Sequence, residues 1–232
     1  MSKKITISIH QPGYLPWLGF FKKISSSDVF VFLDDVKFVR KQWHNRNKIR
    51  TSQGSHWLSV PAKSNVSKNL NDVEIDHSTT WSLNHKKTIQ FSYKKSPFFQ
   101  NYWDFFEELY DEKFEKLIDL NLKIILYLMK VLKIDTKVIL SSELNIKETK
   151  SDRNLSICKK LNADIYLSGA LGVNYLNIND FSENNIKVKI QNFQHPIYKQ
   201  IYEPFIPNMA SIDLLFNEGE NAAKILREAK NF

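Results

Sequence analysis

The sequence has a single cysteine, Cys158, among its 232 residues, which excludes an internal disulfide and a cysteine-rich zinc site. It also lacks a long uninterrupted apolar run. The most apolar stretch, residues 120–132, is broken by Asn121, Lys123 and Lys130 and is too polar to span a bilayer. The opening residues, MSKKITISIHQP, enter a strand pattern at once, so we expect no secretory signal. Together these features predict a cytoplasmic protein without a membrane span.

Several well-known catalytic motifs are absent from the sequence. It contains no G-x-S-x-G nucleophile turn, no Walker A loop and no G-x-G-x-x-G fingerprint. The histidines at positions 56, 77, 85 and 195 show no spacing that is typical of metal ligands. We therefore predict no metal site.

The excess of positive charge is spread along the chain. The formal net charge is +8, and the lysines occur in pairs such as Lys3-Lys4 and Lys86-Lys87 rather than in one basic block. A nucleic-acid-binding protein more often has a dense basic block or a basic helix face. The dispersed charge therefore favours a small phosphate-bearing substrate over nucleic acid.

The chain does contain enough apolar residues to build a core. Its hydrophobic content of 42% and aromatic content of 13% are typical of globular proteins. Apolar, β-branched runs predict buried strands at residues 5–9 and 29–33, and apolar residues at helical spacing predict a helix at 17–24 between them. This order predicts a right-handed parallel βαβ unit, which binds ligands at the carboxyl ends of its strands.

The remaining sequence predicts further elements of an α/β fold. We expect a β-hairpin formed by residues 45–51 and 57–60, and a short strand at 73–75. Strands are also predicted at 137–140, 165–167 and 188–190, and helices at 81–93, 98–110, 114–132, 152–161, 212–216 and 221–229. The simplest account is one α/β domain over residues 1–232. It has a mainly parallel Rossmann-like sheet with a βαβ start, a β-hairpin and a helical insertion at about 79–133.

The first candidate residues follow the two predicted strands of the βαβ unit. His10 and Gln11 end the first strand, and Asp34 and Asp35 end the second. A histidine can act as a general base near neutral pH, and an aspartate on the neighbouring strand end can orient it or bind a cation. The structural alternative is that His10 caps a turn and the aspartates only end a strand. We predict catalytic roles for His10, Asp34 and Asp35, and substrate contact for Gln11.

The segment RKQWHNRNKIR supplies a second group of candidates, in which basic residues alternate with Trp43, a histidine and two asparagines. Arginine side chains match the geometry of phosphate or carboxylate groups, and a tryptophan can stack on a base or a sugar. We predict ligand binding by Arg40, Trp43, Asn45 and Arg46. The alternative is an exposed basic hairpin with no special role.

The segment YLSGALGVNYL places Ser168 and Gly169 directly after a predicted strand, with Gly172 close behind. Glycines permit a close approach of the backbone to a ligand, and amides at a following helix start can bind an anion. Ser168, Gly169 and Gly172 are therefore predicted to contact substrate, although a tight strand-to-helix turn would use the same residues.

A fourth segment precedes the C-terminal helices. Tyr198 and Gln200 come before a proline-bounded stretch, and Ser211 is predicted to be the N-cap of the helix that begins at Ile212. Asp213 in its first turn suits the helix dipole. A structural role is favoured for this segment, but Tyr198 and Gln200 are kept as candidate substrate-binding residues.

Taken together, these segments resemble the WbqC-like protein family. The resemblance covers residue 5 to about residue 220, and Ala210 stands where the family commonly has leucine. It rests on the patterns H-Q-P-x-Y-x-P-W-x-G-F-F at 10–21, the aspartate pair at 34–35, W-x-N-R-N at 43–47, Y-L-S-G-x-x-G-x-x-Y at 166–175, Y-x-Q at 198–200 and S-I-D-L-L-F-N-x-G at 211–219.

The resemblance implies a role in bacterial surface-polysaccharide biosynthesis, for O-antigen, lipopolysaccharide or capsule, in making or decorating a nucleotide-linked sugar. The motif residues, Tyr175 among them, transfer as site residues without assigned chemical roles. Our main hypothesis is a transferase that moves an acyl or aminoacyl group onto an amino sugar. His10 would deprotonate the sugar amine, and Arg40 and Arg46 would hold phosphates. The donor is open among acyl-CoA, acyl carrier protein, aminoacyl-tRNA and an ATP-activated acid, so nucleic acid enters only as a tRNA donor.

Two alternatives stay open. The βαβ start is laid out like that of nucleotidyltransferases with an H-x-G-H motif, but Trp17 and Gly19 occupy that region and both histidines are missing. A non-catalytic binding or scaffold protein of a glycan assembly complex is the other alternative. The sequence does not fix the sugar, the donor or the oligomeric state.

Overall fold

The computed structural model describes residues 3–63 and 68–231. Its centre is a five-stranded sheet with the order β5-β2-β1-β6-β7, in which all neighbouring strands are parallel. The strands are β1 (Thr6–His10), β2 (Val29–Phe32), β5 (Lys137–Leu140), β6 (Ile165–Ser168) and β7 (Lys187–Ile190). The mainly parallel α/β fold predicted from the sequence is confirmed.

The βαβ start has the predicted layout. Helix α1 (Leu18–Ser25) follows β1 and returns the chain to β2, which pairs with β1 in parallel register, Ile7 opposite Val29. Trp17, which was predicted to open the helix, is its N-terminal flanking residue and has an extended backbone. The carboxyl ends of β1 and β2 therefore lie side by side, as a parallel pair requires.

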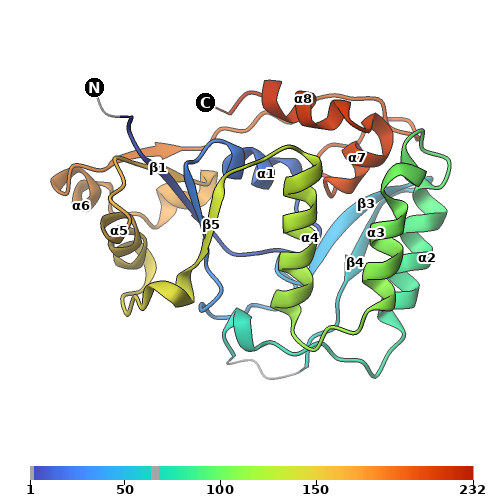
Figure 1. The fold of residues 1–232 in the computed structure, drawn as a ribbon, viewed down its shortest axis with the longest axis horizontal. Helices are drawn as coiled ribbons and strands as arrows, with labels where there is room; N and C mark the ends of the chain where they lie inside the picture. The colour runs from blue at the N-terminus through green and yellow to red at the C-terminus, as the bar shows by residue number, and fades with distance from the viewer. Residues whose placement is uncertain (1–2, 64–67, 232) are drawn as a thin grey trace.

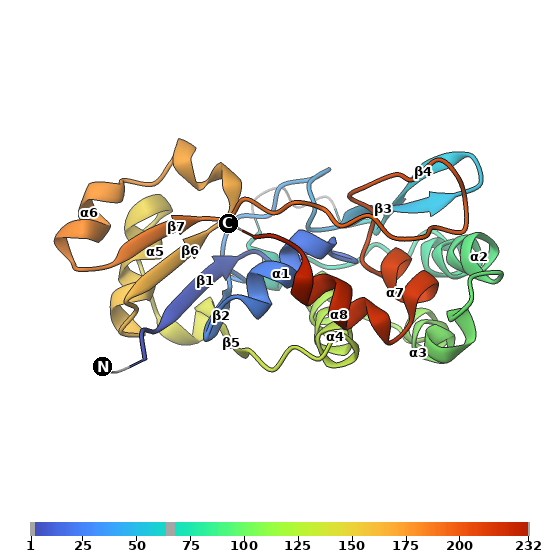
Figure 2. The ribbon, with the colours of Figure 1, turned by 90° about the horizontal axis from the view of Figure 1, so that it is seen from above.

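The sheet separates two apolar clusters, because successive side chains of a strand point to opposite faces. Ile7, Ile9 and Val31 pack with helices α5 (Lys150–Lys160) and α6 (Ile178–Glu183). Phe30 and Phe32 face the larger cluster, which includes α1, α4 (Leu117–Val131) and α8 (Asn221–Glu228). Figure 2 shows these two groups of helices on opposite sides of the strands.

The predicted hairpin is present as the antiparallel pair β3 (Arg46–Thr51) and β4 (Gly54–Ser59). Its turn has two residues, and Gly54 has a φ of +115°, which favours glycine. The strand predicted at 73–75 is wrong. A short 3-10 helix, Leu70–Asp72, precedes this segment, which makes only isolated bridges to Ala62 and Lys116 because no strand runs long enough beside it.

The helical insertion consists of α2 (Trp81–Tyr93), α3 (Phe99–Asp111) and α4, and Figure 1 shows α2 and α3 at the end of the molecule away from α5 and α6. Tyr14, from the loop after β1, is buried against it. Its hydroxyl hydrogen-bonds to His85 of α2 at 2.8 Å and to Tyr110 of α3. Helix α7 (Ile212–Glu218) packs on α3. Besides the 3-10 helix at Leu70–Asp72, three short elements were not predicted: Ser141–Leu144, Ala170–Asn174 and α6. Within the described ranges, no helix has the length and apolarity to cross a bilayer.

Candidate functional site

Polar residues gather where the parallel strands end. β1 ends at His10, β2 leads into Asp34, β5 leads into Ser141, and β6 ends at Ser168. Figure 1 shows β5 running toward the same side of the molecule as its neighbours. Because this edge is where open α/β sheets bind ligands, we take it as the candidate site.

His10 is exposed at the end of β1, and its ring meets Phe20 edge-on with centroids 5.5 Å apart. Nδ1 lies 2.9 Å from the carbonyl oxygen of Gln11, which can only accept, so Nδ1 carries the proton. No described residue hydrogen-bonds to Nε2, which leaves its lone pair free. Desolvation by the surrounding protein and the positive charge of Lys23 lower the pKa of His10 to about 4. The ring is therefore neutral at pH 7 and can accept a proton at Nε2.

Lys23 of α1 is the most unusual charge near this edge. It is 2% exposed, and its Nζ donates to the carbonyl oxygen of Ile9 at 2.8 Å. Among the described residues no carboxylate forms a salt bridge with it, and burial lowers the pKa of Lys23 to about 7. A side chain added at Gly169 would come within 3.9 Å of Nζ, so the loop after β6 passes close to this amine. The β1/β6 part of the edge therefore holds a buried amine that is partly protonated at pH 7 and has no carboxylate partner among the described residues.

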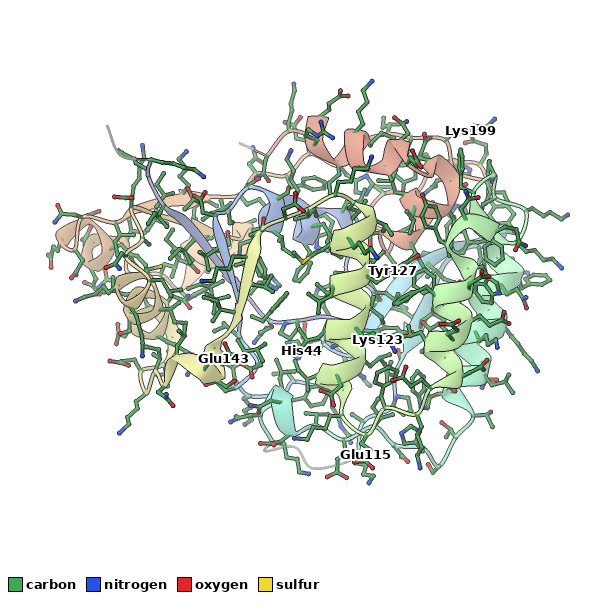
Figure 3. All side chains as sticks on the ribbon, in the orientation of Figure 1. His44, Glu115, Lys123, Tyr127, Glu143 and Lys199 are labelled. Carbon is green, nitrogen blue, oxygen red and sulfur yellow. The ribbon has the colours of Figure 1, made fainter. Side chains whose placement is uncertain are left out.

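Gln11 joins the first motif to the W-x-N-R-N segment. Its side-chain oxygen accepts a hydrogen bond of 2.9 Å from Nε2 of His44, and Asn121 of α4 donates to the carbonyl oxygen of His44 at 2.8 Å. His44 is 5% exposed, and burial lowers its pKa. Figure 3 shows His44 beside α4, on the side of the sheet where Glu143 marks the loop after β5. The structure thus brings two segments that are far apart in the sequence to one place.

The backbone contacts explain why this junction uses glycine and asparagine. A Cβ at Gly13 would lie 2.9 Å from the carbonyl oxygen of Trp43, so a larger residue would push the two segments apart. The amide of Tyr14 donates to the same oxygen at 3.0 Å. Asn47 donates to the carbonyl oxygen of Leu15, a residue with a positive φ. Asn47 therefore stabilises the strained turn that follows the first motif.

The other predicted residues of the second segment lie at the surface or have unused donors and acceptors. Arg40 is exposed and donates to the carbonyl oxygen of Ala62 at 3.1 Å. Asn45 donates to Val60 at 2.8 Å, but its side-chain oxygen is buried without a partner. Nε of Arg46 is likewise buried and unpartnered. Buried polar atoms without partners are rare in proteins, so both are candidates for ligand contact.

Asp34 and Asp35 are engaged with the β5 side of the edge. Asp34 is 2% exposed and accepts hydrogen bonds from the amide and the hydroxyl of Ser142 at 2.9 and 2.7 Å, and from Ser141 at 3.1 Å. Asp35 forms a 2.5 Å salt bridge with Arg153 of α5. Neither carboxylate hydrogen-bonds to His10, whose ring is oriented by the Gln11 carbonyl instead. A catalytic role for the two aspartates stays a prediction.

The third motif lies at the end of β6 and packs closely on itself. Ser168 is fully buried, and a Cβ at Gly172 would overlap its hydroxyl, which explains the glycine. Tyr175 is 52% exposed. The backbone amide of Gln191 donates to the carbonyl oxygen of Ser168 at 2.8 Å. The side-chain amide of Gln191 donates to the carbonyl oxygen of Gly19 at 2.9 Å. The loop is therefore fixed beside α1 and Lys23.

Tyr198 and Gln200 belong to a buried polar cluster around Asp213. The carboxylate accepts hydrogen bonds from Tyr198 at 2.7 Å, from Gln200 at 2.8 Å and from Tyr93 at 2.9 Å, and burial raises its pKa. No hydrogen bond joins the cluster to His10. Ser211 occupies the predicted N-cap position of α7, but its buried hydroxyl makes no capping hydrogen bond. Its amide donates to the carbonyl oxygen of Pro16 at 2.9 Å. The segment packs against the first motif through its backbone.

Sequence reasoning did not identify Lys23, His44 and Asp213 as site or cluster residues. Lys23 lies three residues after Phe20 on the apolar face of α1, a spacing that signals a buried lysine, but the adjacent Lys22 obscures it. His44 was noticed in its segment without a role. Asp213 was interpreted as a helix-dipole residue because its tyrosine partners are distant in sequence.

The described residues contain no group of three or more histidine, cysteine, aspartate or glutamate side chains arranged to hold a metal ion. Comparison with known proteins gives one family match: the sequence model of the WbqC-like protein family matches residues 11–225. A protein of Mycobacterium tuberculosis strain H37Rv, named uncharacterized protein Rv1507c, is 31% identical over 226 residues, which cover 95% of this chain and 97% of that protein. No solved structure gives a significant match.

Proposed function

Because this chain belongs to the WbqC-like protein family, which points to a role in polysaccharide biosynthesis and nothing finer, we propose the following reaction. The protein is a transferase that moves an acyl or aminoacyl group onto the amine of a nucleotide-linked amino sugar, for a bacterial surface polysaccharide. The observation that carries the proposal is the neutral ring of His10, exposed at the carboxyl end of β1 with an unpartnered Nε2.

The proposed step forms one bond and breaks one. The sugar amine attacks the carbonyl carbon of an activated acyl donor, and Nε2 of His10 accepts the proton that the amine loses. The new C–N bond replaces the C–S bond of acyl-CoA or acyl carrier protein, or the C–O bond of an aminoacyl-tRNA. The proton then passes from His10 to the departing thiolate or alkoxide, which becomes a thiol or hydroxyl, and the neutral ring is restored.

A histidine with a pKa of about 4 is a weak base, and we propose that the bound substrate raises the pKa of His10. A nearby negative charge raises the pKa of a histidine. Nucleotide phosphates bound by Arg40 and Arg46 would bring such a charge to an edge where Lys23 has no counterion. His10 would then become an effective base only in the substrate complex.

The other residues of the site are proposed to shape it. Asp34 and Asp35 fix the loop after β2 against β5, and Ser168, Gly169 and Gly172 fix the loop after β6. Gln11 holds the W-x-N-R-N segment against the end of β1. Tyr175 is exposed and is proposed to contact the donor. Tyr198 and Gln200 act indirectly, through the cluster that anchors α7 beside the first motif.

The test combines ligand binding with turnover. The purified protein is screened by thermal shift with nucleotide-linked amino sugars, ATP and acyl-CoA, since a ligand at about 100 times its Kd adds roughly 2.7 kcal/mol of stability. Product formation is then followed by mass spectrometry in His10→Ala and in the control His56→Ala, an exposed histidine on β4. We expect His10→Ala to lose at least about 100-fold in turnover and to keep sugar-nucleotide binding.

Three other results would overturn parts of the proposal. Full turnover in His10→Ala would remove the general base. Stabilisation by ATP with release of pyrophosphate would replace the transferase by a nucleotide-activating enzyme. Absence of binding and turnover with every compound would leave a scaffold protein.

A further inference from the structure

One face of the hairpin carries an exposed tryptophan, Trp57, in contact with two cations and with a second exposed tryptophan, Trp43. Strand register places Lys48 opposite Trp57 and Arg46 opposite Ser59, so Arg46, Lys48 and Trp57 share a face. Trp57 is 38% exposed, and Trp43, just before β3, is 49% exposed. We call these four residues, Trp43, Arg46, Lys48 and Trp57, the tryptophan platform.

The platform is ordered by contacts among its own members. The rings of Trp43 and Trp57 have centroids 5.5 Å apart and are tilted by 39°. The guanidinium carbon of Arg46 lies 4.2 Å from the centroid of the Trp57 ring, and Nζ of Lys48 lies 5.0 Å from it. The two rings are too close for a third ring to enter between them. A planar ligand would therefore stack on the outer face of Trp43, with Trp57 as its support.

The two cations of the platform contact the Trp57 ring, but their charge is not neutralised by a carboxylate of the described residues. Among the described residues, neither Arg46 nor Lys48 forms a salt bridge with a carboxylate. Nε of Arg46 is buried and has no hydrogen-bond partner. An unpaired buried donor is costly unless an acceptor completes it. The platform therefore combines an aromatic surface with a site for an anion.

We propose that the tryptophan platform binds the nucleotide portion of the substrate, with the base stacked on Trp43 and the phosphates held by Arg46 and Lys48. This assignment rests on the proposed function and adds Trp57 and Lys48 to the site. The carbonyl of Trp43 accepts from the amide of Tyr14, and the next residue, His44, bonds to Gln11. The segment that carries Trp43 is therefore hydrogen-bonded to the loop that follows His10.

A nucleotide fits these features better than a neutral glycan does. Sugar rings stack on tryptophan, but they have no group that requires two unpaired cations. A nucleoside diphosphate has both a planar ring and a compact negative charge, and arginine matches phosphate oxygens with paired donors. The uncharged glycan is therefore an outcome that the experiment must separate.

The experiment is isothermal titration of the full chain with nucleoside diphosphates (UDP, GDP, CDP, dTDP and ADP), uridine, inorganic pyrophosphate and a neutral N-acetylglucosamine oligosaccharide. We expect at least one diphosphate to bind more tightly than uridine or pyrophosphate alone. Trp43→Ala should weaken it by about tenfold or more, because stacking on one aromatic residue contributes that much, while Trp43→Phe should retain most of the affinity. Arg46→Gln should weaken the diphosphate and leave uridine unchanged.

Phe91→Ala is the matched control. Phe91 is 72% exposed on α2, and Lys94 lies 5.8 Å from its ring, so it reproduces an exposed aromatic residue beside a cation elsewhere. Its removal should leave diphosphate affinity unchanged. Circular dichroism of each variant confirms that it is folded before titration.

Several results would overturn the platform. Diphosphate binding that survives both Trp43→Ala and Arg46→Gln would place the nucleotide elsewhere, and binding of the oligosaccharide alone would make the platform a glycan site. Absence of binding by every diphosphate would also overturn it. A different result would overturn the transferase and leave the platform in place. In that case diphosphate binding would depend on Trp43, but no acyl transfer would be detected or His10→Ala would keep full turnover.

Discussion

The carboxyl edge of the sheet is built differently in its two halves. After β2 and β5, Asp34 accepts hydrogen bonds from two serines and Asp35 is paired with Arg153. After β1 and β6, Lys23 is buried without a carboxylate, and His10 exposes a free Nε2. Side chains whose bonding capacity is used within the protein hold structure, whereas unused capacity and perturbed pKa values mark functional positions. The unused bonding capacity of this edge therefore lies at β1 and β6 rather than at the acidic pair.

The largest expected effect concerns the part of the edge after β2 and β5, where the carboxylates are hydrogen-bonded within the protein. Asp34→Ala removes the acceptor for the part-buried amide and hydroxyl of Ser142 and one acceptor of the buried Ser141 hydroxyl. We expect it to lower the free energy of unfolding by about 3 kcal/mol, measured by chemical denaturation.

The control for this change is Asp111→Ala, whose carboxylate is 64% exposed in its salt bridge with Lys86. It should change stability by less than about 0.5 kcal/mol. If Asp34→Ala costs no more than this control, Asp34 is not a structural residue and the division of the edge into two halves fails.

The next effect concerns the part of the edge after β1 and β6, where we expect a substitution to raise the free energy of unfolding. Lys23→Met removes a buried charge while keeping the length of the side chain, and we expect it to stabilise the protein by about 2 kcal/mol at pH 6.5. Burial lowers the pKa of Lys23 from 10.5 to about 7 in the folded protein. Between these values the unfolded chain binds more protons than the folded one, so wild-type stability rises with pH across this window.

Denaturation at pH 6.5, 8 and 9.5 measures this difference. The stability gap between Lys23→Met and the wild type should shrink as the pH rises, because the wild-type lysine loses its charge in the folded state first. A variant that is less stable than the wild type at every pH would show that Lys23 has a compensating partner and that the two halves are alike.

The smallest effect links Lys23 to His10. The positive charge of Lys23 is the second cause, after desolvation, of the low pKa of His10, which is about 4. Lys23→Met should therefore raise the pKa of His10 by less than about one unit, followed by NMR of the imidazole Cε1 proton between pH 3 and 8. Lys22→Met, which changes the adjacent lysine, serves as the comparison. An equal shift in both variants, or no shift in either, would show that the charge of Lys23 does not specifically lower the pKa of His10.

Much of the fold was predictable because periodicity survives in the sequence. The apolar, β-branched runs at residues 5–9 and 29–33 predicted β1 and β2, and the helical spacing after residue 79 predicted α2, α3 and α4. The strand expected at 73–75 failed because an apolar triplet does not reveal whether a long neighbour runs beside it. Short elements such as Ala170–Asn174 carry too few residues for a period to appear.

The sequence places candidate residues at the strand ends, but it does not reveal which of their charges are partnered. His10, Asp34 and Ser168 could be placed at one edge because parallel strands end on the same side. Whether a charge is partnered depends on residues far away in sequence: Arg153 for Asp35, and Tyr93 and Tyr198 for Asp213. No local pattern contains these pairings, so the buried state of Lys23 and the cluster around Asp213 required the structure.

The hydroxyl of Tyr14 has a consequence for how the protein is made. Its partners, His85 and Tyr110, lie 71 and 96 residues further along the chain. During synthesis these partners emerge only with α2 and α3, so until then the Tyr14 hydroxyl has water rather than protein as its hydrogen-bond partner. A fragment that ends before residue 79 would contain His10, Gln11 and the whole hairpin, yet it would not be expected to hold them in their working arrangement.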